Sequence, residues 1–131
     1  MERLQQRIKI AKQALSKLDE VLQMHPNTVV RDASLQRFEF CVEAVWKMAQ
    51  LYLRKKEGLD LGSPKQVIRS CFTLDLLNKD QTQTCLRMID DRNLTVHTYD
   101  EELAEKIFSK IKEYAKIMHI LLTRIENKIQ K

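Results

Sequence analysis

The sequence is poor in residues that break helices, with only 2 glycines and 2 prolines among its 131 residues. It also lacks an even set of closely spaced cysteines and a run of about 20 uncharged apolar residues. These shortages exclude a low-complexity chain, a disulfide scaffold and a membrane-spanning helix. Because the amino terminus is polar and charged rather than apolar, we expect a cytoplasmic protein with no membrane partner.

The abundant residues favour helices packed around one core. Hydrophobic residues make up 44% of the chain and charged residues 31%, and the length predicts one domain over residues 1–131. Apolar side chains recur every three or four positions in the segments 4–22, 35–52 and 103–129. We therefore predict an all-α protein, an antiparallel up-and-down four-helix bundle with a short extra helix.

Local signals place the helix ends. Pro26 should end the first helix near Met24, and Asp32 is a plausible N-cap for a second helix that reaches about Glu57. Ser63 followed by proline is a start signal for the short helix. The last apolar stripe predicts one continuous helix of about eight turns that begins just after His97.

The second helix is apolar on two sides. Its expected core stripe contains Leu35, Phe38, Val42, Val45, Ala49 and Tyr52, whereas Phe40, Cys41, Ala44, Met48 and Leu51 lie largely on the other side. A helix with two apolar faces has to bury both of them, and a small bundle has one core to offer. The sequence therefore predicts that the second face forms a homodimer interface.

The remaining stripe of this helix is polar and has two open interpretations. Glu43 and Lys47 can form an ordinary surface ion pair at a spacing of four. Glu39 and Glu43, however, are like charges at the same spacing, and a cation between them would relieve their repulsion. Arg92 or Arg37, from this chain or a second subunit, could supply it, so Glu43 and Arg37 are candidate binding residues.

Charge is distributed unevenly along the chain. The net charge is +5, yet residues 86–106 carry three cations against six anions. This acidic setting disfavours a long phosphate-tracking groove there and leaves room for a compact pocket that binds one phosphate. The cysteines Cys41, Cys71 and Cys85 each fall in an apolar stripe and are expected to be reduced core thiols.

The segment 90–100 holds three residues suited to phosphate chemistry: Arg92, His97 and Tyr99. On one unbroken helix Arg92 and His97 would point about 140° apart, so they converge only if the helix breaks between them. Caps at Thr98 or Asp100 predict such a break. The alternative is an ordinary junction with a surface ion pair and packed rings, because an arginine five residues before a histidine is a common accident.

These residues resemble a known family. The segment from Asp91 to Tyr99 is similar to the Arg-x4-His-x-Tyr signature of the HEPN superfamily, in its nucleotidyltransferase substrate-binding-like, or HepT-like, branch. The likeness covers residues 1 to 125 and includes segments 36–40, 63–68 and 99–114.

The resemblance implies a dimeric four-helix bundle that pairs with a minimal nucleotidyltransferase encoded nearby. Arg92 and His97 match the pair responsible for metal-independent RNA cleavage in HEPN proteins, so no cofactor or metal is expected. Tyr99 matches the hydroxyl that receives nucleotidyl groups from the partner enzyme, and Asn93 matches a positioning residue beside the arginine.

Three functions remain open from the sequence. The first is the endoribonuclease of a toxin–antitoxin pair, silenced when Tyr99 is nucleotidylated. The second is a non-catalytic subunit that binds a nucleotide or substrate for the nucleotidyltransferase. The third is a helical adaptor with a vestigial site. The intact Arg92, His97 and Tyr99 favour the first, and the acidic surroundings favour the second.

Overall fold

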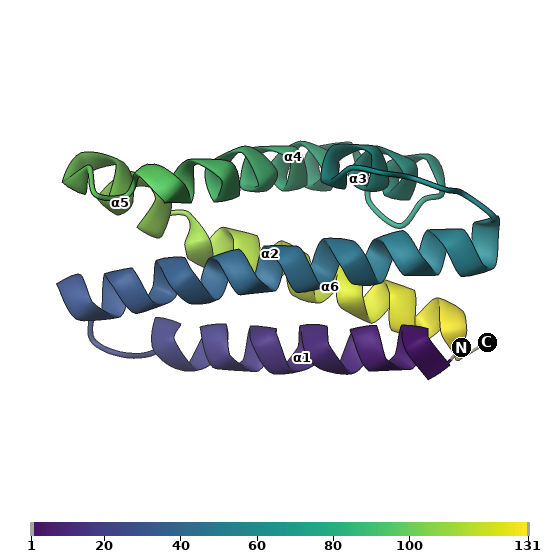
Figure 1. The fold of residues 1–131 in the computed structure, drawn as a ribbon, viewed down its shortest axis with the longest axis horizontal. Coiled ribbons are helices and arrows are strands. Elements are labelled where there is room, and N and C mark those ends of the chain that lie inside the picture. The colour runs from purple at the N-terminus through teal and green to yellow at the C-terminus, as the bar shows by residue number, and fades with distance from the viewer. Residues whose placement is uncertain (1, 131) are drawn as a thin grey trace.

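The computed structural model describes residues 2–130, which form helices and no strands, so the predicted all-α class is confirmed (Figure 1). No helix in this range is long and apolar enough to cross a membrane. The elements are α1 (Glu2–Leu22), α2 (Thr28–Glu57), α3 (Pro64–Thr73), α4 (Lys79–Leu94), the 3-10 turn η1 (Thr95–His97), α5 (Glu101–Phe108) and α6 (Ile111–Ile129).

The long helices α1, α2, α4 and α6 alternate in direction, and α2 occupies the centre (Figure 1). It lies between α1 on one side and α3 with α4 on the other, and it also contacts α5 and α6. The central position of α2 corrects the expectation for its second face. Cys41 and Met48 are fully buried within the chain and Leu51 nearly so, while Phe40 alone is strongly exposed, at 60%.

Of the first two helix starts predicted from caps, one is confirmed and one is wrong. Ser63 accepts a hydrogen bond from the Gln66 backbone N–H and caps α3, as expected. The second helix instead begins four residues before Asp32, because the Asn27 side chain accepts from the Val30 N–H at 2.8 Å and caps it. A short polar side chain directly after a proline is a good N-cap.

The prediction of one continuous last helix is also wrong, because the helix is interrupted at residues 109–110, between α5 and α6. At the break the Lys110 N–H bonds to the Ile107 carbonyl, and the Ser109 hydroxyl donates to the Lys106 carbonyl at 2.7 Å. Such local side-chain bonds compete with the helical ladder. Ile107 and Ile111 are both buried, so the spacing of four runs through the break and conceals it. The bundle therefore has two short helices, α3 and α5.

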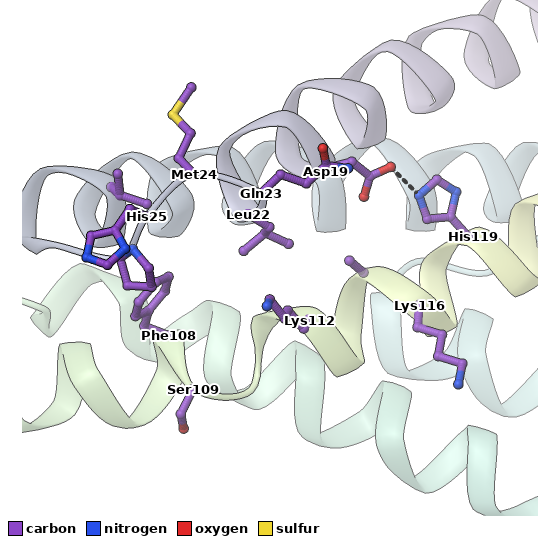
Figure 2. A pocket seen from close by; sticks show the side chains of 13 residues that line it. Asp19, Leu22, Gln23, Met24, His25, Phe108, Ser109, Lys112, Lys116 and His119 are labelled. Carbon is purple, nitrogen blue, oxygen red and sulfur yellow. Dashed lines mark hydrogen bonds and ion pairs between the residues drawn. The ribbon is translucent and has the colours of Figure 1, made fainter.

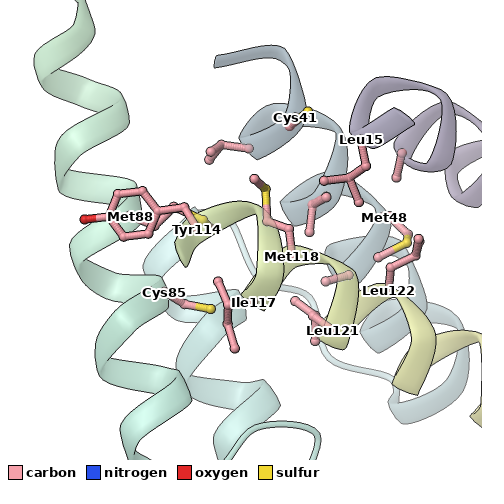
Figure 3. Close-up of a cluster of buried hydrophobic side chains, with 14 of the residues drawn as sticks. Leu15, Cys41, Met48, Cys85, Met88, Tyr114, Ile117, Met118, Leu121 and Leu122 are labelled. Carbon is pink, nitrogen blue, oxygen red and sulfur yellow. The ribbon is translucent and has the colours of Figure 1, made fainter. Parts of the chain in front are cut away.

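Side chains from four helices meet in the core. Leu15 of α1, Met48 of α2, Cys85 of α4 and Met118 of α6 converge there (Figure 3). All three cysteines are free and buried, which confirms the prediction of core thiols. Burial raises the pKa of each thiol to about 12, so these thiols are protonated and unreactive at neutral pH.

Candidate functional site

The predicted break between Arg92 and His97 is present. Helix α4 ends at Leu94, η1 follows, and Asp100 rather than Thr98 caps α5 by accepting from two backbone N–H groups of its first turn. The Thr98 hydroxyl instead donates to the Thr95 carbonyl at 2.8 Å and closes the 3-10 turn. The junction is thus built from local side-chain bonds to the backbone.

The Arg92 end of the junction is tied to the core through its neighbour Asp91. The Tyr114 hydroxyl donates to the Asp91 carboxylate at 2.5 Å, and the Lys110 ammonium lies 3.7 Å from it. The Tyr114 ring is buried and stacks on Phe38, with ring centroids 5.6 Å apart. Burial, and then the bond to Asp91, raise the pKa of Tyr114, so its hydroxyl stays a donor. The last turn of α4 is therefore anchored to α6.

Arg92 lies beside the polar stripe of α2. Burial alone would raise the pKa of the Glu43 carboxyl, but nearby donors and cations outweigh it and lower that pKa. The donors are the Trp46 indole and the Lys47 ammonium, both 3.0 Å away. The positive charge of Arg92 contributes as well. Glu43 thus has its ordinary ion pair with Lys47 and, in addition, a nearby cation from α4.

Arg37 and Asn93 are placed differently from Arg92. Arg37 turns toward α1, where it donates to the Lys17 carbonyl at 2.7 Å and lies 3.5 Å from Glu20. Within one chain it is therefore not the cation beside Glu43. Asn93 is exposed on the last turn of α4, next to Arg92.

His97 and Tyr99 lie together on the exposed part of the junction. The Tyr99 hydroxyl is 3.5 Å from the His97 Nδ1, and the two rings meet edge to face with centroids 6.0 Å apart. Tyr99 is 83% exposed, and His97 is exposed as well. Both rings are therefore accessible to a macromolecular ligand or a partner enzyme.

This arrangement can accept a phosphate from the solvent side. Within residues 2–130 no hydrogen bond or ion pair engages the Arg92 guanidinium, so its donors are available to an anion. Histidine is the side chain used most often for proton transfer in catalysis, and the ring of His97 is exposed. The two side chains are not bonded to each other in the described range, so one protomer presents them as separate groups on an open surface.

A cleft of about 1040 Å³ lies away from the Arg92–Tyr99 junction, between the end of α1, the turn that follows it and the α5–α6 break (Figure 2). His119 and Asp19 are bonded at 2.8 Å at one end of it, and His25 lies near Phe108 at the other. None of Arg92, His97 or Tyr99 lines this cleft. Sequence reasoning misses it because the break that opens it is hidden by the apolar spacing.

Sequence reasoning also misses two residues that hold the junction: Tyr114, which its spacing places in the apolar stripe, and Arg31, which pairs with Glu101 and Glu105 of α5. The two glutamates at a spacing of four signal a need for a cation. Nothing local identifies a residue 70 positions away as its source.

Sequence comparison assigns the chain to a family and to known relatives. Residues 6–127 match the family described as nucleotidyltransferase substrate binding protein like. A probable ribonuclease HepT of Haemophilus influenzae is 28% identical over 101 residues, which cover 74% of this chain and 68% of the relative.

Structural comparison finds solved proteins with the same fold. A Thermus thermophilus protein of known crystal structure is 47% identical, with a TM-score of 0.85 over 88% of this chain and 98% of its own. A tri-AMPylated Shewanella oneidensis HEPN toxin, solved in complex with an MNT antitoxin, has a TM-score of 0.76 over 95% of this chain and 96% of its own. At 16% identity the latter shows a shared fold only.

The resemblance inferred from the segment 91–99 is thereby confirmed at the level of the family, since the match spans nearly all of the described helices. The chain shares the helical fold of a HEPN toxin, and it belongs to the nucleotidyltransferase substrate binding protein like family.

Proposed function

We propose that this protein is the endoribonuclease of a toxin–antitoxin pair whose other member is a minimal nucleotidyltransferase. The observation that carries the proposal is the helix junction, which exposes His97 and Tyr99 and leaves Arg92 partly exposed within eight positions of the chain. The names of the HepT relative and of the HEPN toxin with its MNT antitoxin support the same system.

In the proposed reaction, a 2′-hydroxyl of the RNA is the nucleophile, and histidine and arginine side chains assist its attack. One His97 takes the proton of a ribose 2′-hydroxyl, whose oxygen attacks the adjacent phosphorus. The bond from phosphorus to the 5′-oxygen breaks, and that oxygen receives a proton from a second imidazolium. Arg92 stabilises the negative charge of the phosphorane. The products are a 2′,3′-cyclic phosphate and a 5′-hydroxyl.

Two imidazoles at one phosphate require two protomers, and α2 offers the surface for them. Phe40, Glu43 and Lys47 follow one another at spacings of three and four, so they share one side of the helix. Phe40 is 60% exposed, and the charge of Arg92 helps to lower the pKa of Glu43 on the same side. A homodimer through this side would bring both copies of Arg92 and His97 toward one cleft.

Tyr99 is the residue best placed for nucleotidylation. The chain has three tyrosines, of which Tyr52 and Tyr114 are buried and Tyr99 is 83% exposed. The Tyr99 oxygen would attack the α-phosphorus of a nucleoside triphosphate in the partner enzyme, losing its proton to a base while pyrophosphate leaves. The added phosphodiester would place negative charge beside His97 and block the cleft.

The cleavage is tested with purified protein and RNA in the presence of a chelator. Wild type should cleave, and His97→Ala should lose about 100-fold or more of the rate, since general acid–base catalysis contributes on that scale. Arg92→Ala should be similarly impaired. His25→Ala, an exposed histidine in the α1–α2 turn, is the matched control and should cleave normally. No cleavage by any of these proteins would reject the ribonuclease function.

Nucleotidylation is tested by mass spectrometry after co-expression with the neighbouring nucleotidyltransferase. Added nucleotidyl mass is expected on the peptide that contains Tyr99, and the buried Tyr52 and Tyr114 serve as internal controls. A stable complex with an unmodified Tyr99 would remove this mode of silencing.

The dimer is tested by solution mass. Phe40→Glu should give a folded monomer, because it buries a charge in the proposed interface. Val29→Glu, at an exposed apolar position near the start of the same helix, should leave the dimer intact. An unchanged mass for Phe40→Glu would reject this side of α2 as the interface.

A second candidate function is a non-catalytic subunit that binds a nucleotide or substrate for the nucleotidyltransferase. Residues 86–106 carry three cations and six anions, a net charge of −3, which disfavours a polyanion such as RNA, and the family description names substrate binding. Calorimetry with nucleoside triphosphates separates the two functions. Binding that requires Arg92, together with no RNA cleavage, would establish the second function.

A further inference from the structure

Arg31 is a charged side chain in an unusual place. It projects from the first turn of α2 and is 3% exposed, although arginine is almost never buried without partners. Its Nη1 donates to Glu101 at 2.6 Å and to Glu105 at 2.9 Å, and its Nε donates to Asp32 at 3.0 Å. One buried cation therefore joins the start of α2 to the first turns of α5.

The acidic residues after the motif have a structural explanation in this contact. Glu101 and Glu105 lie one turn apart on the same side of α5, where their charges would repel each other. The Arg31 guanidinium bonds to both, and these two bonds raise its pKa above the usual value, so it remains a cation. Asp100 is also occupied, because it caps the helix. Three of the six anions of residues 86–106, Asp100, Glu101 and Glu105, are thus engaged by partners within the chain.

The contact lies next to the part of the junction that has little other support. Glu101 is the first residue of α5 and follows Tyr99 by two positions and His97 by four. His97 and Tyr99 are exposed and bonded mainly to each other, at 3.5 Å. Their position relative to the core is set where the chain is fixed on either side: at Asp91 through Tyr114, and at Glu101 through Arg31.

We propose that Arg31 is a positioning residue for the reaction at His97, acting through Glu101 and Glu105 to hold the start of α5 and hence the turn that carries the imidazole and the Tyr99 hydroxyl. The catalytic part of this inference rests on the proposed ribonuclease function. The positioning part can be measured without it.

The test compares Arg31→Met with Arg124→Met. Arg124 is a partly buried arginine that also joins two elements, donating to the Leu76 carbonyl at 2.9 Å and to Gln81 at 2.8 Å, neither of which belongs to α5. Arg31→Met is expected to fold, because methionine is an unbranched side chain that adapts to irregular buried space and the released carboxylates of Glu101 and Glu105 are already largely exposed. Glu101→Gln is a second variant that leaves the buried side chain in place.

Hydrogen exchange gives the readout that does not depend on activity. Amides of residues 98–105 should exchange about tenfold or more faster in Arg31→Met, the scale of one lost charge-assisted hydrogen bond, and to a lesser extent in Glu101→Gln. Arg31→Lys should recover part of the protection, because an ammonium can reach one of the two glutamates. Arg124→Met should leave these amides unchanged. Unchanged exchange in Arg31→Met would overturn the inference.

Kinetics then tests the catalytic part. In Arg31→Met, kcat for RNA cleavage should fall about tenfold with little change in KM, and Arg31→Lys should restore part of it. A wild-type kcat in Arg31→Met, or an equal loss in Arg124→Met, would reject the positioning role. If wild type itself fails to cleave RNA while the exchange result holds, the proposed function fails and the positioning of the turn stands.

Discussion

Arg92 and His97 are only five positions apart, yet the structure holds them in different ways. Arg92 lies on the last turn of α4, where the preceding residue, Asp91, accepts a hydrogen bond from the buried Tyr114. Arg92 also lies near Glu43 of the central helix α2. His97 ends a 3-10 turn whose first residue, Thr95, is buried, whereas the side chains of Val96 and His97 are exposed and the turn is bonded only locally. A cation carried on an anchored helical turn and an acid–base group on a less restrained turn suit a reaction that needs both charge stabilisation and proton transfer.

The largest effect should come from removing the anchor on the Arg92 side. Tyr114→Ala deletes a buried ring that stacks on Phe38, and large-to-small changes of aromatic core residues cost about 3–5 kcal/mol. Urea unfolding followed by circular dichroism measures the loss. A cost below about 1 kcal/mol would show that this end of the junction is not held by the core.

A smaller effect should come from the hydroxyl alone. Tyr114→Phe keeps the ring and removes the bond to Asp91, so the free energy of unfolding should fall by about 1.5–3 kcal/mol, the range for hydrogen bonds to charged groups. The same unfolding measurement applies. Tyr99→Phe is the matched control, because its exposed hydroxyl makes only the long contact to His97.

The stability gap between wild type and Tyr114→Phe should narrow at alkaline pH. Burial and then the Asp91 bond raise the pKa of Tyr114 in the folded protein. Above the usual tyrosine pKa of about 10, the Tyr114 hydroxyl therefore loses its proton in the unfolded chain first. This lowers the free energy of the unfolded chain and so reduces the stability of wild type relative to Tyr114→Phe. The contribution is complete below about pH 10 and should shrink by about 1 kcal/mol at about pH 10.5. Both proteins carry the same buried thiols, so subtraction removes their share. A constant gap would contradict the buried hydroxyl.

The smallest effect is expected on the His97 side. His97→Ala and Val96→Ser change exposed side chains and should alter the free energy of unfolding by no more than about 0.5 kcal/mol. Thermal unfolding of the two variants beside wild type checks this. A loss of about 2 kcal/mol or more would show that the turn is packed as firmly as the Arg92 side, and the contrast between the two ends would disappear.

Features encoded by neighbouring residues could be predicted. The cap at Ser63 and the break after Arg92 depend on side chains that bond within three or four positions, so the local sequence contains all the information. The predicted start of the second helix is wrong because Asn27 and Asp32 are both good caps. Only the Asn27 side chain reaches a free backbone N–H.

Features that depend on distant packing could not be predicted. The sequence predicts a dimer through the second apolar face of α2 because a small bundle is expected to have one core. In the structure α2 is central and contacts helices on several sides, so Cys41 and Met48 of that face are buried within the same chain. Of the large apolar side chains on that face, Phe40 is the one that stays strongly exposed and available for an interface. The break before α6 is hidden in the sequence because buried Ile107 and Ile111 keep helical spacing across it.

The sequence by itself determined the all-α class, the family and the identity of the three residues at the junction, because periodicity and a motif are properties of neighbouring positions. Only the tertiary structure decided how those residues are held. The cations and donors that neutralise and anchor the junction come from Arg31 and Tyr114, which lie on other helices. Which helix supplies such a partner depends on how the bundle packs, and no local pattern encodes it.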